Sequence, residues 1–159
     1  MEYLNLYDKA GNLTNEKGIR GEKTDKLVGI ALIFIENSKG EFLIQKTSPS
    51  RESVYATTGG HVSYGSTFEE TIINEVKEEL GIDITNDNII EMNTYIRERV
   101  IQKVFYLKKD INISEITIQE DEVEFIEWLT KEEINEIIKN KEFRPSNLEP
   151  YKYVLEHIK

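Results

Sequence analysis

Hydrophobic and polar residues alternate or cluster along this chain in a pattern that predicts a strand-rich domain. Residues 2–7 alternate apolar and polar side chains and precede a turn at 9–12, which predicts a hairpin within residues 1–25. Residues 27–36 form an apolar, β-branched run typical of a buried strand, and residues 41–47 are its predicted hairpin partner.

Four further segments have strand character. They are residues 57–62, 89–97, 100–108 and 123–129. Trp128, near the end of the last segment, is expected in the core. Residues 111–119 show no clear period, so no element is predicted there.

A helix is predicted over residues 66–80, with Ser66 or Thr67 as its N-cap and Gly81 as the residue that ends it. Its apolar residues fall on one arc of the helix and should face the sheet; they are Phe68, Ile72, Ile73, Val76 and Leu80.

Two helices are predicted in the C-terminal part of the chain. Thr130 can cap the first, because Glu133 follows it three residues later. Pro145 is expected to break the chain before a final short helix at 151–158. The order of elements predicts an α+β fold, a mixed β-sheet sandwiched between helices in an α/β/α arrangement, within a single domain of residues 1–159.

Three glutamates of the 66–80 helix lie beside its apolar arc. Glu75, Glu78 and Glu79 occupy an arc of roughly 100°, and Glu79 lies at the edge of the apolar side. Charged residues on a helix are most often solvated. These three, however, fall within about one turn and repel one another, while Gly59–Gly60 before the helix would let a ligand approach the backbone. Because hard divalent cations prefer carboxylate oxygens, a cation would turn this repulsion into coordination.

Composition narrows the candidate functions. The absence of cysteine excludes disulfides, thiolate metal sites and cysteine nucleophiles. The formal net charge of −10 predicts repulsion of a nucleic-acid backbone, so no nucleic-acid partner is expected. No apolar run has the roughly 18–20 residues that cross a bilayer, and residues 1–20 lack a secretion signal, so no membrane partner and a cytoplasmic location are expected.

Residues 60–82 resemble the Nudix box, G-x5-E-x7-R-E-U-x-E-E-x-G-U, in which U is bulky and apolar. The matching residues are Gly60, Glu75, Val76, Glu78, Glu79, Gly81 and Ile82. Ser66 replaces the first box glutamate and Asn74 replaces the arginine. The hairpin and the sequence Gly-Gly-His-Val at 59–62 resemble the branch related to isopentenyl-diphosphate isomerase, but that enzyme's cysteine is absent here. The resemblance therefore implies a MutT-like Nudix hydrolase rather than an isomerase.

The resemblance also implies a metal site. It implies Mg²⁺, or Mn²⁺, held by Glu75, Glu78 and Glu79, with the Gly60 carbonyl as a further oxygen. Nudix sites often recruit another acid from a loop before the last strand, and Glu122 is the expected one. Glu120 and Glu124 compete for that role. The base that activates water would be Glu75 or Glu122, so the catalytic residues expected are Glu75, Glu78 and Glu122.

The implied reaction is hydrolysis of a small-molecule diphosphate, such as the pyrophosphate linkage of a nucleoside diphosphate derivative. Arg51 and Tyr64 are the expected substrate contacts. Weaker candidates are Lys46, Arg97, Arg99 and Lys103 for phosphate, Tyr55 and Tyr95 for a base, and His61 as a metal ligand. The alternative is a nucleotide-binding protein with little turnover, since the altered Ser66 and Asn74 would weaken the box. A homodimer is an expectation from the family.

Overall fold

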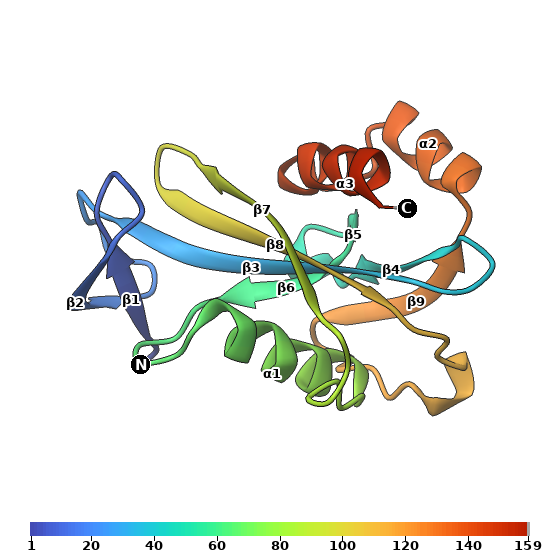
Figure 1. The fold of residues 1–159 in the computed structure, drawn as a ribbon, viewed down its shortest axis with the longest axis horizontal. Coiled ribbons are helices and arrows are strands. Elements are labelled where there is room, and N and C mark those ends of the chain that lie inside the picture. Colours follow the sequence, from blue (N-terminus) through green and yellow to red (C-terminus); the bar gives the residue numbers. More distant parts are fainter. Residues whose placement is uncertain (159) are drawn as a thin grey trace.

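A strongly curled mixed sheet forms the centre of the protein in the computed structural model, which describes residues 1–158 (Figure 1). Its strands are β1 (Tyr3–Tyr7), β2 (Leu13–Ile19), β3 (Leu27–Glu36), β4 (Phe42–Thr47), β5 (Tyr55–Ala56), β6 (Thr58–His61), β7 (Ile90–Ile96), β8 (Val100–Lys108) and β9 (Val123–Leu129). Its helices are α1 (Phe68–Leu80), α2 (Lys131–Lys139) and α3 (Pro145–His157), with short 3-10 turns at Pro49–Arg51 and Ile113–Glu115. Every strand predicted from the sequence is present.

Strand β3 connects the parts of this sheet. It pairs antiparallel with β1, β4 and β6 and parallel with β8, in a register that runs from Val28 opposite Val100 to Glu36 opposite Lys108. The sheet is therefore mixed, as predicted. Most of β3 is buried, which explains its continuous apolar sequence.

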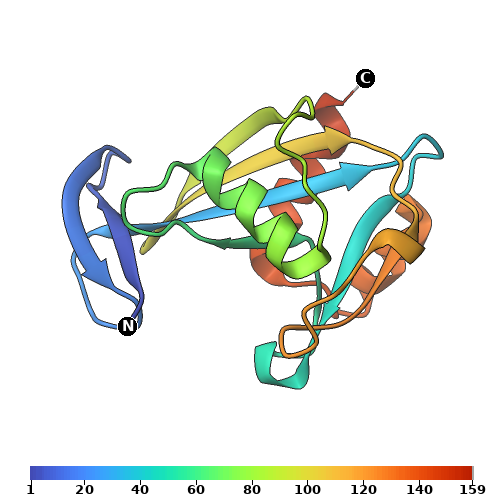
Figure 2. The same cartoon turned by 90° about the horizontal axis from the view of Figure 1, so that it is seen from below.

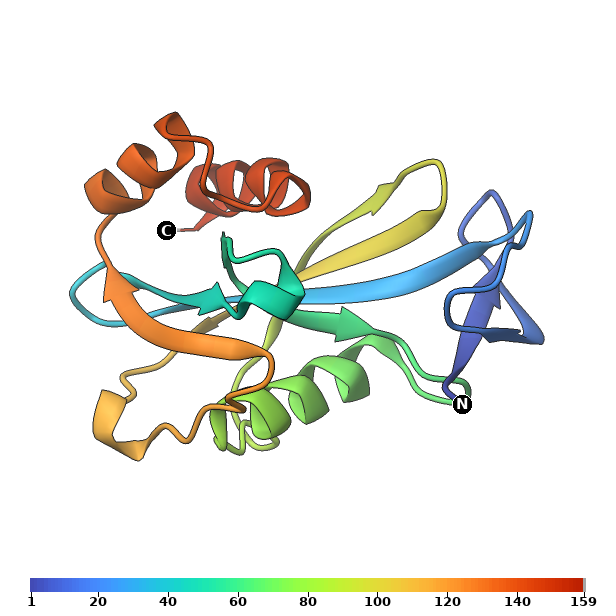
Figure 3. The same ribbon diagram turned by 180° about the vertical axis from the view of Figure 1, so that it is seen from behind.

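Helices cover both faces of the sheet and create two apolar cores. On one face, Ile72, Val76 and Leu80 of α1 are fully buried against residues of β3 and β8. On the other, Tyr151 of α3 packs against Phe34 and other aromatic side chains, with ring centroids 6.0 Å apart for that pair. Figures 2 and 3 show α1 and α3 on opposite sides of the strands. This confirms the predicted sandwich.

Helix α1 begins and ends at capped residues. Thr67, and not Ser66, is the N-cap: its side chain accepts a hydrogen bond from the Glu70 N–H, and the Glu70 carboxylate accepts one from the Thr67 N–H. Gly81 ends the helix with φ +70°, a left-handed conformation that favours glycine, and its N–H donates to the Lys77 carbonyl. The box helix is thus fixed at both ends.

The final helix is longer than predicted. The expectation that Pro145 breaks the chain and that a helix follows at 151–158 is wrong, because α3 begins at Pro145 itself. A proline in the first turn lacks only an N–H that would have no intrahelical partner. Pro150 lies inside the helix and cannot donate to the Ser146 carbonyl, which instead accepts a hydrogen bond of 3.1 Å from the Gln102 amide.

The predicted N-terminal hairpin is present as β1 and β2. Figure 1 shows it at the end of the sheet remote from α2 and α3. Leu6 and Tyr7 of β1 pair with the first residues of β3, and Leu4 forms a further bridge to Ser63. No helix in residues 1–158 is long and apolar enough to cross a membrane.

Candidate functional site

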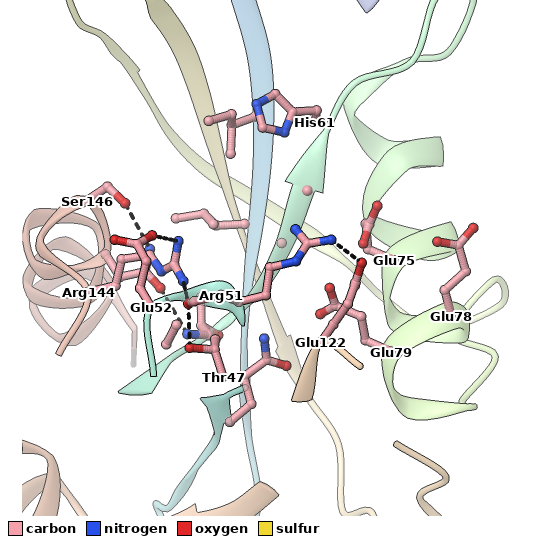
Figure 4. A pocket seen from close by; sticks show the side chains of 18 of the residues that line it. Thr47, Arg51, Glu52, His61, Glu75, Glu78, Glu79, Glu122, Arg144 and Ser146 are labelled. Atoms are coloured by element: carbon pink, nitrogen blue, oxygen red, sulfur yellow. Dashed lines mark hydrogen bonds and ion pairs between the residues drawn. The ribbon is translucent and has the colours of Figure 1, made fainter. Parts of the chain in front are cut away.

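A cavity of about 550 Å³ lies between α1, the edge strand β6, and the loops that contain Arg51 and Glu122 (Figure 4). We call it the glutamate cavity. Four of the acids that line it are those predicted from the sequence: Glu75, Glu78, Glu79 and Glu122. The predicted residues Gly60, Arg51 and His61 also line it.

Glu79 is buried in spite of its charge, and Glu75 is half-buried. Glu79 is only 5% exposed, which confirms its position at the apolar edge of the helix, and its Oε1 has no hydrogen-bond partner within residues 1–158. Burial, and then the charges of Glu75 and Glu122, raise the pKa of Glu79. Burial, and then the charge of Glu78, also raise the pKa of Glu75. The carboxyl groups of Glu75 and Glu79 therefore resist being ionised at the same time unless a positive charge lies between or beside them.

Gly60 allows the approach of Glu75 to the β6 backbone. A Cβ atom at position 60 would lie 2.4 Å from both Cδ and Oε1 of Glu75, closer than such contacts occur. The carboxylate therefore occupies the space that any other side chain would fill. This close approach places the Gly60 backbone beside the glutamate cluster, as the sequence predicts.

The donor set fits a hard divalent cation. Oxygen ligands from several carboxylates and a backbone carbonyl are what Mg²⁺ and similar ions prefer. The unpartnered buried Oε1 of Glu79 is consistent with such a ligand. Within residues 1–158, however, no three acidic or histidine side chains already converge as a closed metal site. In Figure 4, Glu78 extends along the outer side of α1, away from Glu122.

Glu122 enters the site from the loop before β9 and is held by Arg51. The Arg51 Nη2 lies 2.5 Å from the Glu122 Oε1. The two loops are also joined through the backbone, because the Ser48 N–H donates to the Glu122 carbonyl at 3.0 Å. Glu120 and Glu124 are exposed and do not line the cavity, so the structure favours Glu122 among the three.

The wall opposite the glutamates comes from residues that sequence reasoning missed. Gln102 is 1% exposed, and Asn147 is equally buried and accepts a hydrogen bond from the Thr57 N–H. Arg144 donates to Glu52 at 3.4 Å and to the Arg51 carbonyl at 3.2 Å. Arg144 immediately precedes Pro145. Because a proline can begin a helix, this position could have indicated that Arg144 lies at a helix N-terminus. Its position in the cavity follows from tertiary pairing with β5.

Several other predicted contacts lie elsewhere. Tyr64 is 44% exposed and does not line the cavity; the Lys17 ammonium lies 5.0 Å from its ring centroid. The remaining weaker candidates, namely Lys46, Tyr55, Tyr95, Arg97, Arg99 and Lys103, are also absent from the cavity lining. His61 does line it, and burial, followed by the charge of Arg20, lowers its pKa.

The two altered box positions have different local environments. Asn74 is exposed and forms no side-chain hydrogen bond with residues 1–158. The loop that contains Ser66 is held by Asn5 of β1, which is 4% exposed. The Asn5 amide donates to the Ser66 carbonyl at 2.8 Å and accepts from the Gly65 N–H at 2.9 Å. The hairpin therefore holds the loop in a part of the box where the usual glutamate is missing.

This geometry can be compared with known proteins. Residues 26–153 match the NUDIX domain family. The chain belongs to the Nudix family. An uncharacterized Nudix hydrolase of Listeria innocua is 31% identical over 151 residues, which cover 91% of this chain and 89% of the relative. The NAD-capped RNA hydrolase NudC of Pseudomonas aeruginosa is 26% identical over 100 residues, which cover 63% of this chain and 35% of NudC. These matches identify a Nudix-type pyrophosphohydrolase.

Solved structures support the fold. A crystal structure from Deinococcus radiodurans superposes with a TM-score of 0.78 at 23% identity, covering 92% of this chain and 94% of that one. MutT from Methanosarcina mazei superposes with a TM-score of 0.63 at 21% identity, covering 87% of this chain and all of MutT. The α/β/α Nudix fold predicted from the sequence is therefore confirmed.

Proposed function

We propose that this Nudix protein hydrolyses the phosphoanhydride bond of a small organic diphosphate, such as a nucleoside diphosphate linked to another group, with Mg²⁺ or Mn²⁺. The observation that carries the proposal is the group of acids facing one cavity, with the pKa raised at the half-buried Glu75 and the buried Glu79 and an unpartnered Oε1 on Glu79. Carboxylates in such surroundings are stabilised by a bound divalent cation.

Glu75, Glu78, Glu79, Glu122 and the Gly60 carbonyl would hold the metal. For this, the Glu78 side chain, which points away from Glu122 in Figure 4, would have to turn towards the other acids. When bound, Mg²⁺ supplies the positive charge that draws a diphosphate to an acidic site and stabilises charge developing on its oxygens.

Glu75 is our choice as the general base. Its carboxyl group lies beside the Gly60 backbone in the cavity, whereas one oxygen of Glu122 already accepts from Arg51. Glu75 would take a proton from the attacking water as the water oxygen bonds to phosphorus. The bond from that phosphorus to the bridging oxygen breaks, which leaves two phosphate-bearing products.

Two arginines are suited to bind the substrate. Arg51 crosses the cavity towards Glu122, and Arg144 lies on the opposite wall. Guanidinium groups bind phosphate oxygens through paired N–H donors. Both could exchange an intramolecular carboxylate partner for a substrate phosphate.

The test is a hydrolysis screen over nucleoside triphosphates, nucleotide sugars, ADP-ribose, dinucleoside polyphosphates and prenyl diphosphates. Reactions contain Mg²⁺, Mn²⁺ or EDTA. We expect turnover with metal, none in EDTA, and a loss of about 10²-fold or more in Glu78→Gln. Glu69→Gln is the matched control, because Glu69 is an exposed glutamate of the same helix outside the cavity lining. Equal loss in both variants would contradict a specific role for Glu78.

A binding protein with little turnover is the second candidate. The observation in its favour is the exposed Asn74, which forms no side-chain hydrogen bond with residues 1–158, where the box arginine is expected. This candidate predicts thermal stabilisation by a nucleotide without hydrolysis of any substrate in the screen. A homodimer and the exclusion of nucleic acid remain predictions, to be tested by sedimentation and by competition with RNA.

A further inference from the structure

A second cavity, about 380 Å³ in volume, lies between the N-terminal hairpin and the start of β3. We call it the hairpin pocket. Five of the 20 Lys and Arg residues of the chain line it, against one carboxylate, that of Glu22. The five are Lys17, Arg20, Lys23, Lys26 and Arg99. In a chain with a formal net charge of −10, this is a local reversal of sign.

Three of these five cations have no ion pair within residues 1–158, and one of the three, Lys17, lies over the Tyr3 and Tyr64 rings at 4.6 and 5.0 Å from their centroids. Arg20 and Lys26 pair with acids of the hairpin at 2.9 and 3.6 Å. Lys17, Lys23 and Arg99 form no ion pair with any residue of the described part of the chain. Like charges gathered around one concave surface repel one another, and an anion bound among them would relieve that repulsion.

The hairpin pocket and the glutamate cavity adjoin one another. Arg20 and His61 line both. Val28 lines the hairpin pocket, and Ile30 and Leu32 line the glutamate cavity. These alternate residues of β3 lie on one face of the strand, and Val28 to Leu32 spans roughly 13 Å at about 3.3 Å per residue. One bound molecule can therefore contact both cavities.

We propose that the hairpin pocket is a second anion subsite, which binds a phosphate carried by the part of the substrate remote from the scissile diphosphate. The substrate class is then a nucleotide diphosphate derivative with an additional phosphate monoester. This inference rests on the proposed function of the glutamate cavity. A small molecule fits better than a polynucleotide, because the cations of the hairpin pocket lie beside an acidic cavity and the chain as a whole is acidic.

The first experiment tests anion binding without the metal. Inorganic pyrophosphate is titrated into the ¹⁵N-labelled protein in EDTA at low salt. We expect saturable shifts of the amides of residues 17–26 and 99. Lys23→Gln combined with Arg99→Gln should weaken this binding about tenfold. Lys139→Gln combined with Lys152→Gln, two exposed lysines of α2 and α3 remote from the hairpin (Figure 1), is the matched control and should bind as the wild type does. Lys23→Gln alone provides a second variant if the double variant unfolds.

The second experiment tests the connection between the two cavities. Calorimetry with Mg²⁺ compares α,β-methylene-ADP with the same analogue carrying a 3′-phosphate; neither can be hydrolysed at the methylene bridge. We expect the 3′-phosphorylated analogue to bind about tenfold more tightly, and this preference to vanish in the Lys23→Gln/Arg99→Gln protein but not in the control.

Three outcomes would overturn the proposal. The first is that pyrophosphate shifts no amide signals at the hairpin pocket. The second is that pyrophosphate shifts these signals but the protein binds the two ADP analogues equally tightly. The third is that a 5′-diphosphorylated oligoribonucleotide binds more tightly than the 3′-phosphorylated analogue. The second would indicate an independent anion site, and the third a polynucleotide site. Both experiments measure binding. A failure of the proposed hydrolase activity, seen as no turnover in the substrate screen, is therefore distinguishable from a failure of the subsite.

Discussion

Replacing Glu79 by glutamine should stabilise the metal-free protein while it abolishes metal-dependent hydrolysis. Glu79 is 5% exposed, and its Oε1 has no partner within residues 1–158. Burial and the neighbouring Glu75 charge raise its pKa in the folded state above the ordinary value of 4.5. Folding therefore favours the protonated form, and the wild-type protein loses stability as the pH rises from about 4.5 towards the raised folded pKa.

Glutamine has the shape and charge of the protonated glutamate at every pH, so the variant lacks this loss. Each unit of raised pKa corresponds to about 1.4 kcal/mol. For one buried carboxylate the gain at pH 8 is on the order of 1–3 kcal/mol. In a domain of this size, each kcal/mol shifts Tm by roughly 2–4 °C. We expect Glu79→Gln to raise Tm by roughly 2–12 °C at pH 8 in EDTA and to leave it nearly unchanged at pH 5.

The assay is thermal unfolding followed by circular dichroism at both pH values, with and without Mg²⁺. Added Mg²⁺ should raise the Tm of the wild type at pH 8 more than that of the variant. Glu69→Gln removes an exposed glutamate from the same helix and should show no pH-dependent difference. The inference that ionisation of the buried Glu79 destabilises the protein would be refuted if Glu79→Gln were no more stable than the wild type at pH 8 in EDTA.

Three further substitutions test the site and its support. Asn5→Ala removes two hydrogen bonds to the loop before α1. The free energy of unfolding, measured in a denaturant titration, should therefore fall by about 1–3 kcal/mol. An unchanged free energy would contradict the role of Asn5 in holding that loop. Gly60→Ala places a Cβ 2.4 Å from the Glu75 carboxyl. Turnover should therefore fall about 10²-fold, while Tm changes by only about 5 °C or less. Full turnover would contradict the close approach of Glu75 to the β6 backbone. Tyr106→Phe removes a 2.6 Å hydrogen bond to the buried Glu36 and should destabilise the protein by about 1–3 kcal/mol in thermal unfolding without affecting metal-dependent turnover.

The sequence by itself determined most of the strands and the acidic face of α1. Strands β3, β8 and β9 have the predicted bounds, because continuous apolar or alternating runs of this length have few other ways to bury their side chains. The placement of Glu79 at a buried edge also followed from helical geometry alone, since angle around a helix depends only on residue number.

Only the tertiary structure decided how distant segments meet in the two cavities. The 3-10 turn that contains Arg51, the loop at Glu122 and the first turn of α3 are far apart in the sequence. The curl of the sheet and its cross-strand pairing bring them together. The start of α3 was mispredicted because a proline can either break a helix or begin one, depending on whether the neighbouring carbonyl groups find hydrogen-bond donors. Here the Gln102 amide donates a hydrogen bond to the Ser146 carbonyl. The hairpin pocket could not be predicted either, because charges spaced along the chain become one positive surface only when the hairpin folds over β3.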